Sequence, residues 1–186
     1  MLVTNFSPFP VLQSDRLLLR QITTNDVDAV FELRSNPETM RYIPRPVAKS
    51  TADAIDLITQ ITSKINQNTD INWAITLKKN SDLIGIIGHY RINHENYRSE
   101  IGYILNPNFN NLGIVTEATT LILDYGFNVL QLHSTEAIID PNNCASAKVL
   151  LKNGFIKEAH FIENGFFDGK FIDSAVYSLL NRNFKK

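Results

Sequence analysis

Three consecutive runs of branched and aromatic residues limit the folds open to this chain more than any other feature of its sequence. The runs lie at residues 72–77, 83–92 and 98–105, and each has the length and composition of a β-strand. Polar segments at 79–82 and 94–96 predict the turns between them. Strands joined by such short turns pair antiparallel, so the sequence predicts a meander at the centre of the fold.

Helical patterns flank this meander. Before it, a strand at 16–20 leads to a helix that starts near Thr24 and ends at Asn36-Pro37, and Ser50 then caps a second helix. After the meander, helices are predicted at 114–129 and at 143–152. The apolar positions that predict the buried helix faces are Val27, Val30 and Phe31, then Ile55, Ile58, Ile61 and Ile65, and finally Ile114, Ala118, Leu121, Ile122, Tyr125 and Val129.

Three more strands are predicted at 135–139, 155–162 and 171–180, with turn residues at Asn164-Gly165 and Asp168-Gly169. The predicted order is β-α-α-β-β-β-α-β-α-β-β. This order gives a single α/β (α+β) domain over residues 1–186. Its twisted, mixed and mostly antiparallel sheet has about seven strands and is flanked by about four helices.

Composition narrows the class of protein. A formal net charge of -1 provides no broad basic surface for nucleic acid or membrane, and no apolar stretch is long enough to cross a bilayer. The one cysteine, Cys144, cannot form an internal disulfide, and the first ten residues do not resemble a signal peptide, so we expect a cytoplasmic protein. The four histidines lack metal-ligand spacing, so no metal site is predicted.

The segment 100–117 is the most informative about chemistry. A strand runs into a short loop, and a helix begins near Gly113. The first amides of a helix have no internal partners and attract anions such as a diphosphate. Gly113 has no Cβ, which permits close approach of phosphate to the backbone, although glycine at this place is also ordinary turn chemistry.

Short motifs follow one another in a fixed order from about Leu12 to about Leu180. They are Ser14-Asp15-Arg16-Leu17-Leu18-Leu19-Arg20, Trp73-Ala74-Ile75, Leu83-Ile84-Gly85, Glu100-Ile101-Gly102-Tyr103, Gly113 with Thr116-Glu117-Ala118, Asn143-Cys144-Ala145-Ser146, Asn153-Gly154-Phe155, Asp173, and Tyr177-Ser178-Leu179-Leu180. In this order and spacing they resemble the GNAT acyltransferase superfamily, in particular the branch of ribosomal-protein N-terminal acetyltransferases. The resemblance implies an N-acetyltransferase that moves an acetyl group from acetyl-CoA to an amine.

The resemblance also implies where acetyl-CoA binds. The cofactor would lie where two strands separate, one ending at Asn106 and the other at Asp140, and its pantetheine arm would pair with the backbone of Ile104 and Leu105. The implied cofactor residues are Ile104, Leu105, Asn110, Asn111, Leu112, Gly113, Ile114, Val115, Thr116, Asn143 and Ser146. Two positions depart from the family's diphosphate loop: Asn110 replaces Gln or Arg, and the bulkier Val115 replaces Gly or Ala.

Glu100 is the candidate general base, and Ser146 is the candidate group that holds the leaving thiolate. Each has a simpler interpretation: Glu100 as a solvated charge on a strand, and Ser146 as a polar residue on a helix surface. The backbone amide near Ile104 is the implied oxyanion donor. Leu150 stands where many GNAT enzymes have a tyrosine acid. We interpret Asn143 as a helix cap and Cys144 as a small buried side chain.

The acceptor is an amine, either a protein N-terminus or a small molecule, and its identity does not follow from the fold. Aromatic residues that would line an acceptor site, or else belong to the core, are Tyr42, Trp73, Tyr90, Tyr97 and Phe167. His89 is interpreted as an ordinary strand residue, and the loop 41–49 as a cover of the acceptor site. Two alternatives stay open: a catalytically silent acetyl-CoA-binding module, and an acyltransferase for longer acyl groups. The oligomeric state is also open, with a homodimer as one option.

Overall fold

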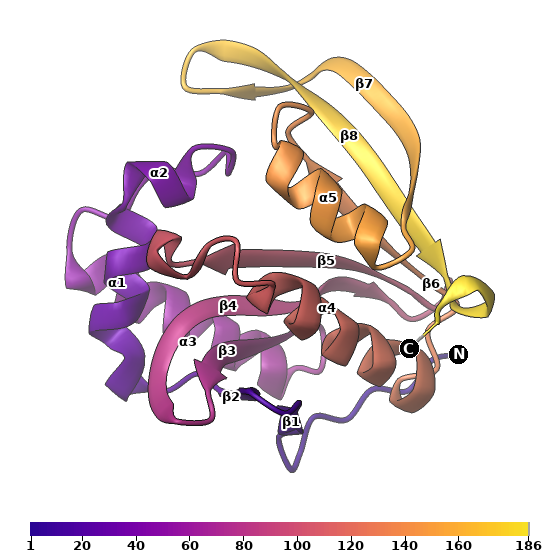
Figure 1. Cartoon of the computed structure of the whole chain (residues 1–186), viewed down its shortest axis with the longest axis horizontal. Helices are drawn as coiled ribbons and strands as arrows, with labels where there is room; N and C mark the ends of the chain where they lie inside the picture. Colours follow the sequence, from indigo (N-terminus) through magenta and orange to yellow (C-terminus); the bar gives the residue numbers. More distant parts are fainter. Residues whose placement is uncertain (186) are drawn as a thin grey trace.

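The computed structural model describes residues 1–185, which form one eight-stranded sheet with helices on both faces (Figure 1). The strand order is β1-β2-β3-β4-β5-β6-β8-β7, and every neighbouring pair is antiparallel except β5 and β6. This confirms the predicted α/β class and the mixed, mostly antiparallel sheet. The strands are β1 (Leu12–Gln13), β2 (Leu17–Gln21), β3 (Ile71–Leu77), β4 (Asn80–Asn93), β5 (Arg98–Leu105), β6 (Ser134–Ile139), β7 (Ile156–Phe167) and β8 (Lys170–Leu180).

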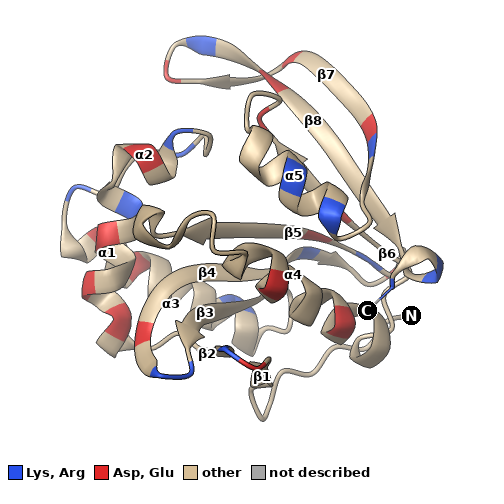
Figure 2. Cartoon of the chain, viewed as in Figure 1, with Lys and Arg blue, Asp and Glu red and all other residues tan. Residues whose placement is uncertain are grey.

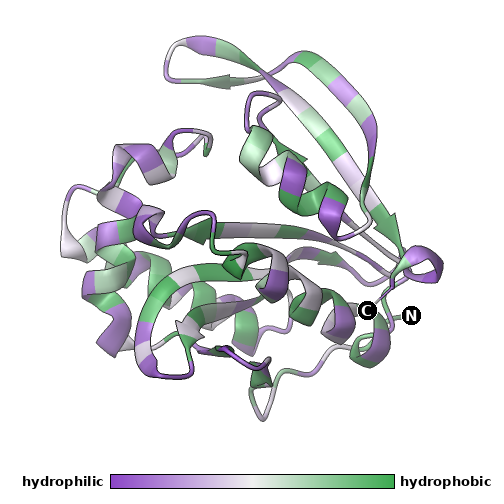
Figure 3. Ribbon diagram, in the orientation of Figure 1, coloured by the Kyte–Doolittle hydropathy of each residue, from purple (hydrophilic) through white to green (hydrophobic). Residues whose placement is uncertain are grey.

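The described residues also form five α-helices. They are α1 (Val27–Ser35), α2 (Pro37–Met40), α3 (Thr51–Asn66), α4 (Ile114–Asp124) and α5 (Cys144–Lys152). In Figure 1, α3 lies behind the sheet and packs against α1, while α4 lies in front of it and contacts α5. The helices carry hydrophobic and hydrophilic residues side by side along their length (Figure 3), as amphipathic helices do when one face packs on a sheet.

The predicted meander is present as β3, β4 and β5, but its first turn is in a different place. Leu77 pairs with Asn80, so the turn consists of Lys78 and Lys79, and the predicted turn 79–82 is wrong. Polar residues continue the ladder here because they lie at the exposed end of the strand, where pairing needs no apolar side chain. The second turn, at 94–96, is confirmed and also includes Tyr97.

The C-terminal hairpin is longer than predicted. β7 runs from Ile156 to Phe167, so Asn164-Gly165 lies within the strand, beside a register shift, and only Asp168-Gly169 forms the turn. Most side chains of β7 are exposed, because this strand is at the edge of the sheet. An exposed edge strand lacks the buried apolar pattern that would mark where it ends.

The predicted helices also need corrections. The helix predicted at 114–129 is α4 followed by a π-helical turn, η3 (Tyr125–Val129), and Val129 is exposed. In α3, Ile55 is exposed and Ala54 replaces it on the buried face with the other predicted isoleucines. The extra helix α2 starts at Pro37, because Asn36 caps the amides of the next turn. The extra strand β1 explains why the sheet has eight strands instead of about seven.

The core places Trp73 at the centre of the sheet. Its side chain is fully buried, packs edge-on against Phe9, Tyr125 and His89, and donates a 2.7 Å hydrogen bond from Nε1 to the Pro10 carbonyl. Trp73 is therefore a core residue, which was one of the two interpretations left open for it, the other being a place in the acceptor site. The sheet around it holds β4 and β5 in fixed register beneath α4.

The pairing of β5 with β6 is the feature that opens the sheet. The two strands are parallel and pair only at Arg98, Ser99 and Glu100, opposite Ser134, Thr135 and Glu136. Beyond Glu100, β5 stays paired with β4 on its other side, while β6 stays paired with β8. The two strands therefore separate, and backbone groups along the open edge of β5 are left for another partner.

Candidate active site

A cavity of about 540 Å³ follows the opening beyond Glu100. Its walls are the end of β5, the loop before α4, the start of α5 and part of the segment after α2. Ten of the predicted cofactor residues line it, namely Ile104, Leu105, Asn110, Asn111, Gly113, Ile114, Val115, Thr116, Asn143 and Ser146. The eleventh, Leu112, is exposed and does not line the cavity.

The loop before α4 has the backbone form needed at a phosphate-binding turn. Gly113 is the N-cap of α4 with φ of 74°, in the left-handed region that suits glycine. Asn111 is also left-handed, with φ of 62°. The amides of the first turn of α4 lie at the cavity, where Ile114, Val115 and Thr116 line it. The loop can therefore present unpaired donors to an anion.

Arg16, in the segment before β2, contacts this loop and stabilises it. Its Nη2 donates to the Leu112 carbonyl at 2.9 Å, and its Nε lies 2.5 Å from a carboxylate oxygen of Glu117, in the first turn of α4. Ser14 donates a short hydrogen bond to the same carboxylate. Sequence reasoning missed this contact, although Arg16 and Glu117 both belong to the motifs of the resemblance. Arg16 neutralises an anion that would otherwise repel a diphosphate.

We expect Arg16→Gln to weaken CoA binding about 10-fold, since it removes the charge opposite Glu117 and the support of the Leu112 carbonyl. The dissociation constant for CoA, measured by calorimetry, tests this. Arg20→Gln is the matched control, because Arg20 pairs with Asp26 at 2.7 Å in the same strand region but does not contact the loop. Equal CoA affinity in both variants would contradict the role of Arg16.

The start of α5 forms the opposite wall. Asn143 caps the helix by accepting from the Ser146 amide at 3.0 Å, and Tyr103 donates from its hydroxyl to the Ser146 carbonyl at 3.3 Å. Burial raises the pKa of Tyr103 to about 12, so its hydroxyl stays protonated. Lys148 and Lys152 of α5 also line the cavity, and Figure 2 shows their positive charge on this helix. Ser146 is thus held at the wall between β5 and α5.

Two residues near this wall clarify the sequence interpretation. Leu150 is fully buried in the core and does not line the cavity, so it acts as a packing residue. Cys144 is exposed, so the prediction that it is a buried side chain is wrong. It is the first residue of α5, where the chain leaves the Asn143 cap at the surface.

Glu100 occupies the point where β5 and β6 separate. Its side chain is 18% exposed and its carboxylate lies 2.5 Å from Nη1 of Arg91. Burial raises the pKa of Glu100, while the guanidinium groups of Arg91 and Arg45 act in the opposite direction. Glu100 lines neither this cavity nor the second one described next. A carboxyl with a raised pKa at the split suits a proton acceptor, and the catalytic role stays a prediction.

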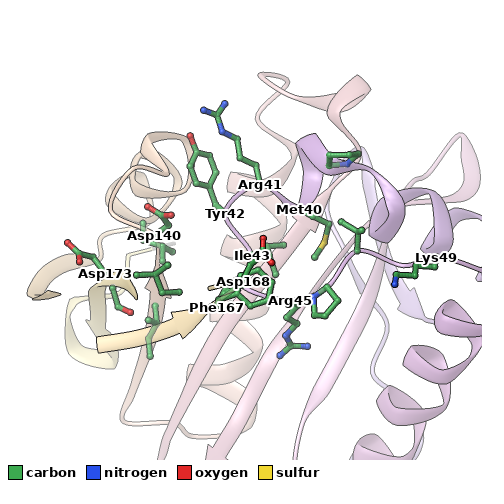
Figure 4. A pocket seen from close by; sticks show the side chains of 18 residues that line it. Met40, Arg41, Tyr42, Ile43, Arg45, Lys49, Asp140, Phe167, Asp168 and Asp173 are labelled. Atoms are coloured by element: carbon green, nitrogen blue, oxygen red, sulfur yellow. The ribbon is translucent and has the colours of Figure 1, made fainter. Parts of the chain in front are cut away.

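A second cavity, of about 630 Å³, lies on the other side of the segment after α2 (Figure 4). The chain from Met40 to Lys49 forms one wall, and the end of β6 with the β7–β8 hairpin forms the other. Tyr42 and Phe167 line it, whereas Tyr90 and Tyr97 do not. Arg41, Tyr42 and Ile43 line both cavities. The two cavities therefore meet at this segment.

His89 belongs to the core and lies outside both cavities. It is fully buried, with Nδ1 2.8 Å from Ser99 Oγ and Nε2 2.8 Å from the Ile122 carbonyl oxygen. Burial lowers its pKa from 6.5 to about 4, so His89 is neutral at pH 7. The interpretation of His89 as an ordinary strand residue agrees with these contacts.

The unfolded chain binds a proton at His89 more readily than the folded protein between pH 6.5 and pH 4. The free energy of unfolding is therefore expected to fall across this window as pH decreases, by about 3 kcal/mol from this group. Urea unfolding of the wild type and of His89→Gln at several pH values tests this. The variant should show the shallower pH dependence, and parallel profiles would contradict the assignment.

Residues 1–185 contain no group of three or more His, Cys, Asp or Glu side chains arranged to hold a metal ion. Over the same residues, no helix has both the length and the apolar character required for a membrane span.

Comparisons with known proteins agree with this geometry. The sequence model of the acetyltransferase (GNAT) domain matches residues 16–156. YoaA of Bacillus subtilis, an uncharacterized N-acetyltransferase, is 35% identical over 172 residues, which cover 92% of this chain and 97% of YoaA. A GNAT-family acetyltransferase from Bacillus anthracis superposes with a TM-score of 0.84 at 28% identity, over 93% of this chain and 99% of that one.

The spermidine N-acetyltransferase from Vibrio cholerae, in complex with CoA and spermine, superposes with a TM-score of 0.81 over 91% of this chain and 98% of that one. At 22% identity this likeness concerns the fold. The match of the domain model and the similarity to YoaA cover most of the chain. The chain therefore belongs to the GNAT acetyltransferase family.

Proposed function

We propose that this protein transfers an acetyl group from acetyl-CoA to a primary amine, by direct attack within a ternary complex. One observation carries the proposal: the opening between β5 and β6 leads to an amide-lined helix start on one side and to a second cavity on the other. Family membership supports the reaction class. The opening would hold the cofactor, and the second cavity would hold the acceptor.

In the proposed reaction the acceptor nitrogen attacks the thioester carbonyl carbon. A nitrogen–carbon bond forms and the carbon–sulfur bond breaks, which leaves an amide and the CoA thiolate. Glu100 would accept the proton that the amine loses, directly or through water, and the amide of Ile104 would donate to the developing oxyanion. Ser146 would donate a hydrogen bond to the thiolate until the proton taken up by Glu100 returns to the sulfur through water.

The protein's main contribution is alignment, because a thioester is already activated. Holding the two reactants in line can reduce the barrier by about 7–11 kcal/mol. The residues suited to this task are those of the segment shared by the two cavities, Arg41 to Ile43, which would border both reactants. A protein N-terminus and a small-molecule amine are both candidate acceptors, and a structural neighbour is named for spermidine.

Two measurements test the proposal. Calorimetric titration with acetyl-CoA should show binding, and a thiol-release assay with a panel of amines and N-terminal peptides should show turnover. No binding at millimolar acetyl-CoA would defeat the proposal. Binding without turnover on any amine would favour a silent module, and tighter binding of longer acyl-CoAs would favour a different acyl group.

A further inference from the structure

The second cavity has walls of opposite charge. Arg41 and Arg45 belong to the wall that follows α2, and Asp140 and Asp168 belong to the opposite wall (Figure 4). Most of the remaining lining is apolar, from residues such as Ile139, Ile172 and Phe167. Such a cavity suits a compact acceptor that carries charges of both signs and an apolar part.

The basic wall is not neutralised within the protein. Over residues 1–185, no carboxylate forms an ion pair with Arg34, Arg41 or Arg45. Arg41 instead lies over the ring of Tyr42, with 5.2 Å from its Cζ to the ring centroid. Unpaired guanidinium groups at a cavity wall leave it able to bind an anion.

Arg34 contacts several residues of this wall and stabilises its position. Its Nη1 is 3.1 Å from Met40 Sδ, its Nη2 donates to the Pro46 carbonyl at 3.4 Å, and its own carbonyl accepts from the Ala48 amide at 2.9 Å. Burial, followed by repulsion from Arg45, lowers the pKa of Arg34. The fold thus holds two guanidinium groups near each other without a carboxylate between them, an arrangement that a bound anion would stabilise.

Arg45 also connects the cavity to the candidate base. It lines the cavity, and its positive charge acts to lower the pKa of both Glu100 and Tyr90, which lie opposite each other on β5 and β4. The proposed proton acceptor and an unpaired cation therefore act on the same region. A molecule with an amine next to an anionic group has the complementary arrangement, with its amine toward Glu100 and its anion toward Arg45.

We propose that Arg45 binds an anionic group of the acceptor, so that the substrate carries a carboxylate or phosphate-type anion close to the amine that is acetylated. This inference rests on the proposed function. It separates this protein from an enzyme for polyamines, because a polyamine has no anionic group for Arg45 and could be attracted only by the aspartates of the opposite wall.

The test compares leucine, leucinamide and the aminophosphonate analogue of leucine, which share one side chain and differ in the group beside the amine. Arg45→Gln should lower kcat/KM about 10-fold to 100-fold for leucine, the phosphonate or both, the size of a lost charge-assisted hydrogen bond. For leucinamide the change should stay within about 3-fold. Arg45→Lys should keep part of the activity, and the exposed turn variant Lys79→Gln should change none of the three.

The two anionic compounds distinguish a carboxylate from a phosphate-type ligand. The better match to Arg45 is the compound for which Arg45→Gln loses more kcat/KM. An equal loss for leucine and leucinamide, or a wild-type preference for spermidine over both anionic compounds, would overturn the inference. If acetyl-CoA binds but no compound is acetylated, titration of the three leucine compounds into the CoA complex decides instead. Failure of both anionic compounds to bind would then overturn it, whereas failure of acetyl-CoA itself to bind would reject the proposed function.

Discussion

Glu100→Gln is expected to lower kcat by about two to four orders of magnitude, the range for loss of a general base, while the dissociation constant for acetyl-CoA stays the same. The reason is the position of Glu100 at the split between β5 and β6, with a pKa that burial raises. Steady-state kinetics with any accepted amine, together with calorimetry, measure both quantities. Glu136→Gln is the matched control, since Glu136 is the residue of β6 that lies opposite Glu100 in the ladder between the two strands.

The pH profile distinguishes a base from a surface charge. A base must be deprotonated, so kcat/KM should fall as pH decreases through the raised pKa of Glu100. Arg91 lowers that pKa by its charge and by a hydrogen bond, so Arg91→Gln should move this limb to higher pH. If Glu100→Gln retains activity within about 3-fold, Glu100 is only a partly buried strand charge, and another group or a water takes the proton.

Gly113→Val is expected to weaken CoA binding by about 100-fold, which corresponds to about 2.7 kcal/mol. Two effects contribute. A β-branched residue at a φ of 74° strains the loop, by about 1–2 kcal/mol. The added side chain also crowds Arg16, which contacts the loop, because the new Cβ lies 3.4 Å from its Nη2. Calorimetric titration with CoA measures the affinity.

Gly169→Val separates strain from loss of the binding site. Gly169 has a φ of 76° in the β7–β8 turn, and a Cβ there would meet nothing within 4 Å. This variant should pay a similar conformational cost in thermal unfolding yet bind CoA like the wild type. Unchanged affinity in folded Gly113→Val would show that the loop before α4 does not contact the diphosphate.

Periodicity and composition were sufficient for most of the fold. The strands β3 and β4 have continuous buried runs, and α3 and α4 have amphipathic patterns, so these elements were readily predicted. The exposed edge strand β7 and the four-residue helix α2 lack such patterns, since few of their side chains are buried. Their limits were therefore missed or misplaced.

The candidate site divides in the same way. The loop around Gly113 was predictable because adjacent residues form it and its backbone form requires glycine. The contact between Arg16 and Glu117 was not, because 101 positions separate the two residues and only the fold brings them together. The loop 41–49 was predicted to cover the acceptor site, but the sequence did not show that Arg41 to Ile43 also border the first cavity, since the other walls of both cavities come from distant parts of the chain.

The short pairing of β5 with β6 has a consequence for the protein without its ligand. Past Glu100 the molecule carries two unpaired strand edges in its interior, rather than at the rim of the sheet where most proteins protect them. Exposed edges invite pairing with another chain. A pantetheine arm bound as proposed would fill that opening, so CoA in the storage buffer should slow self-association and protect the amide hydrogens of this stretch from exchange with solvent.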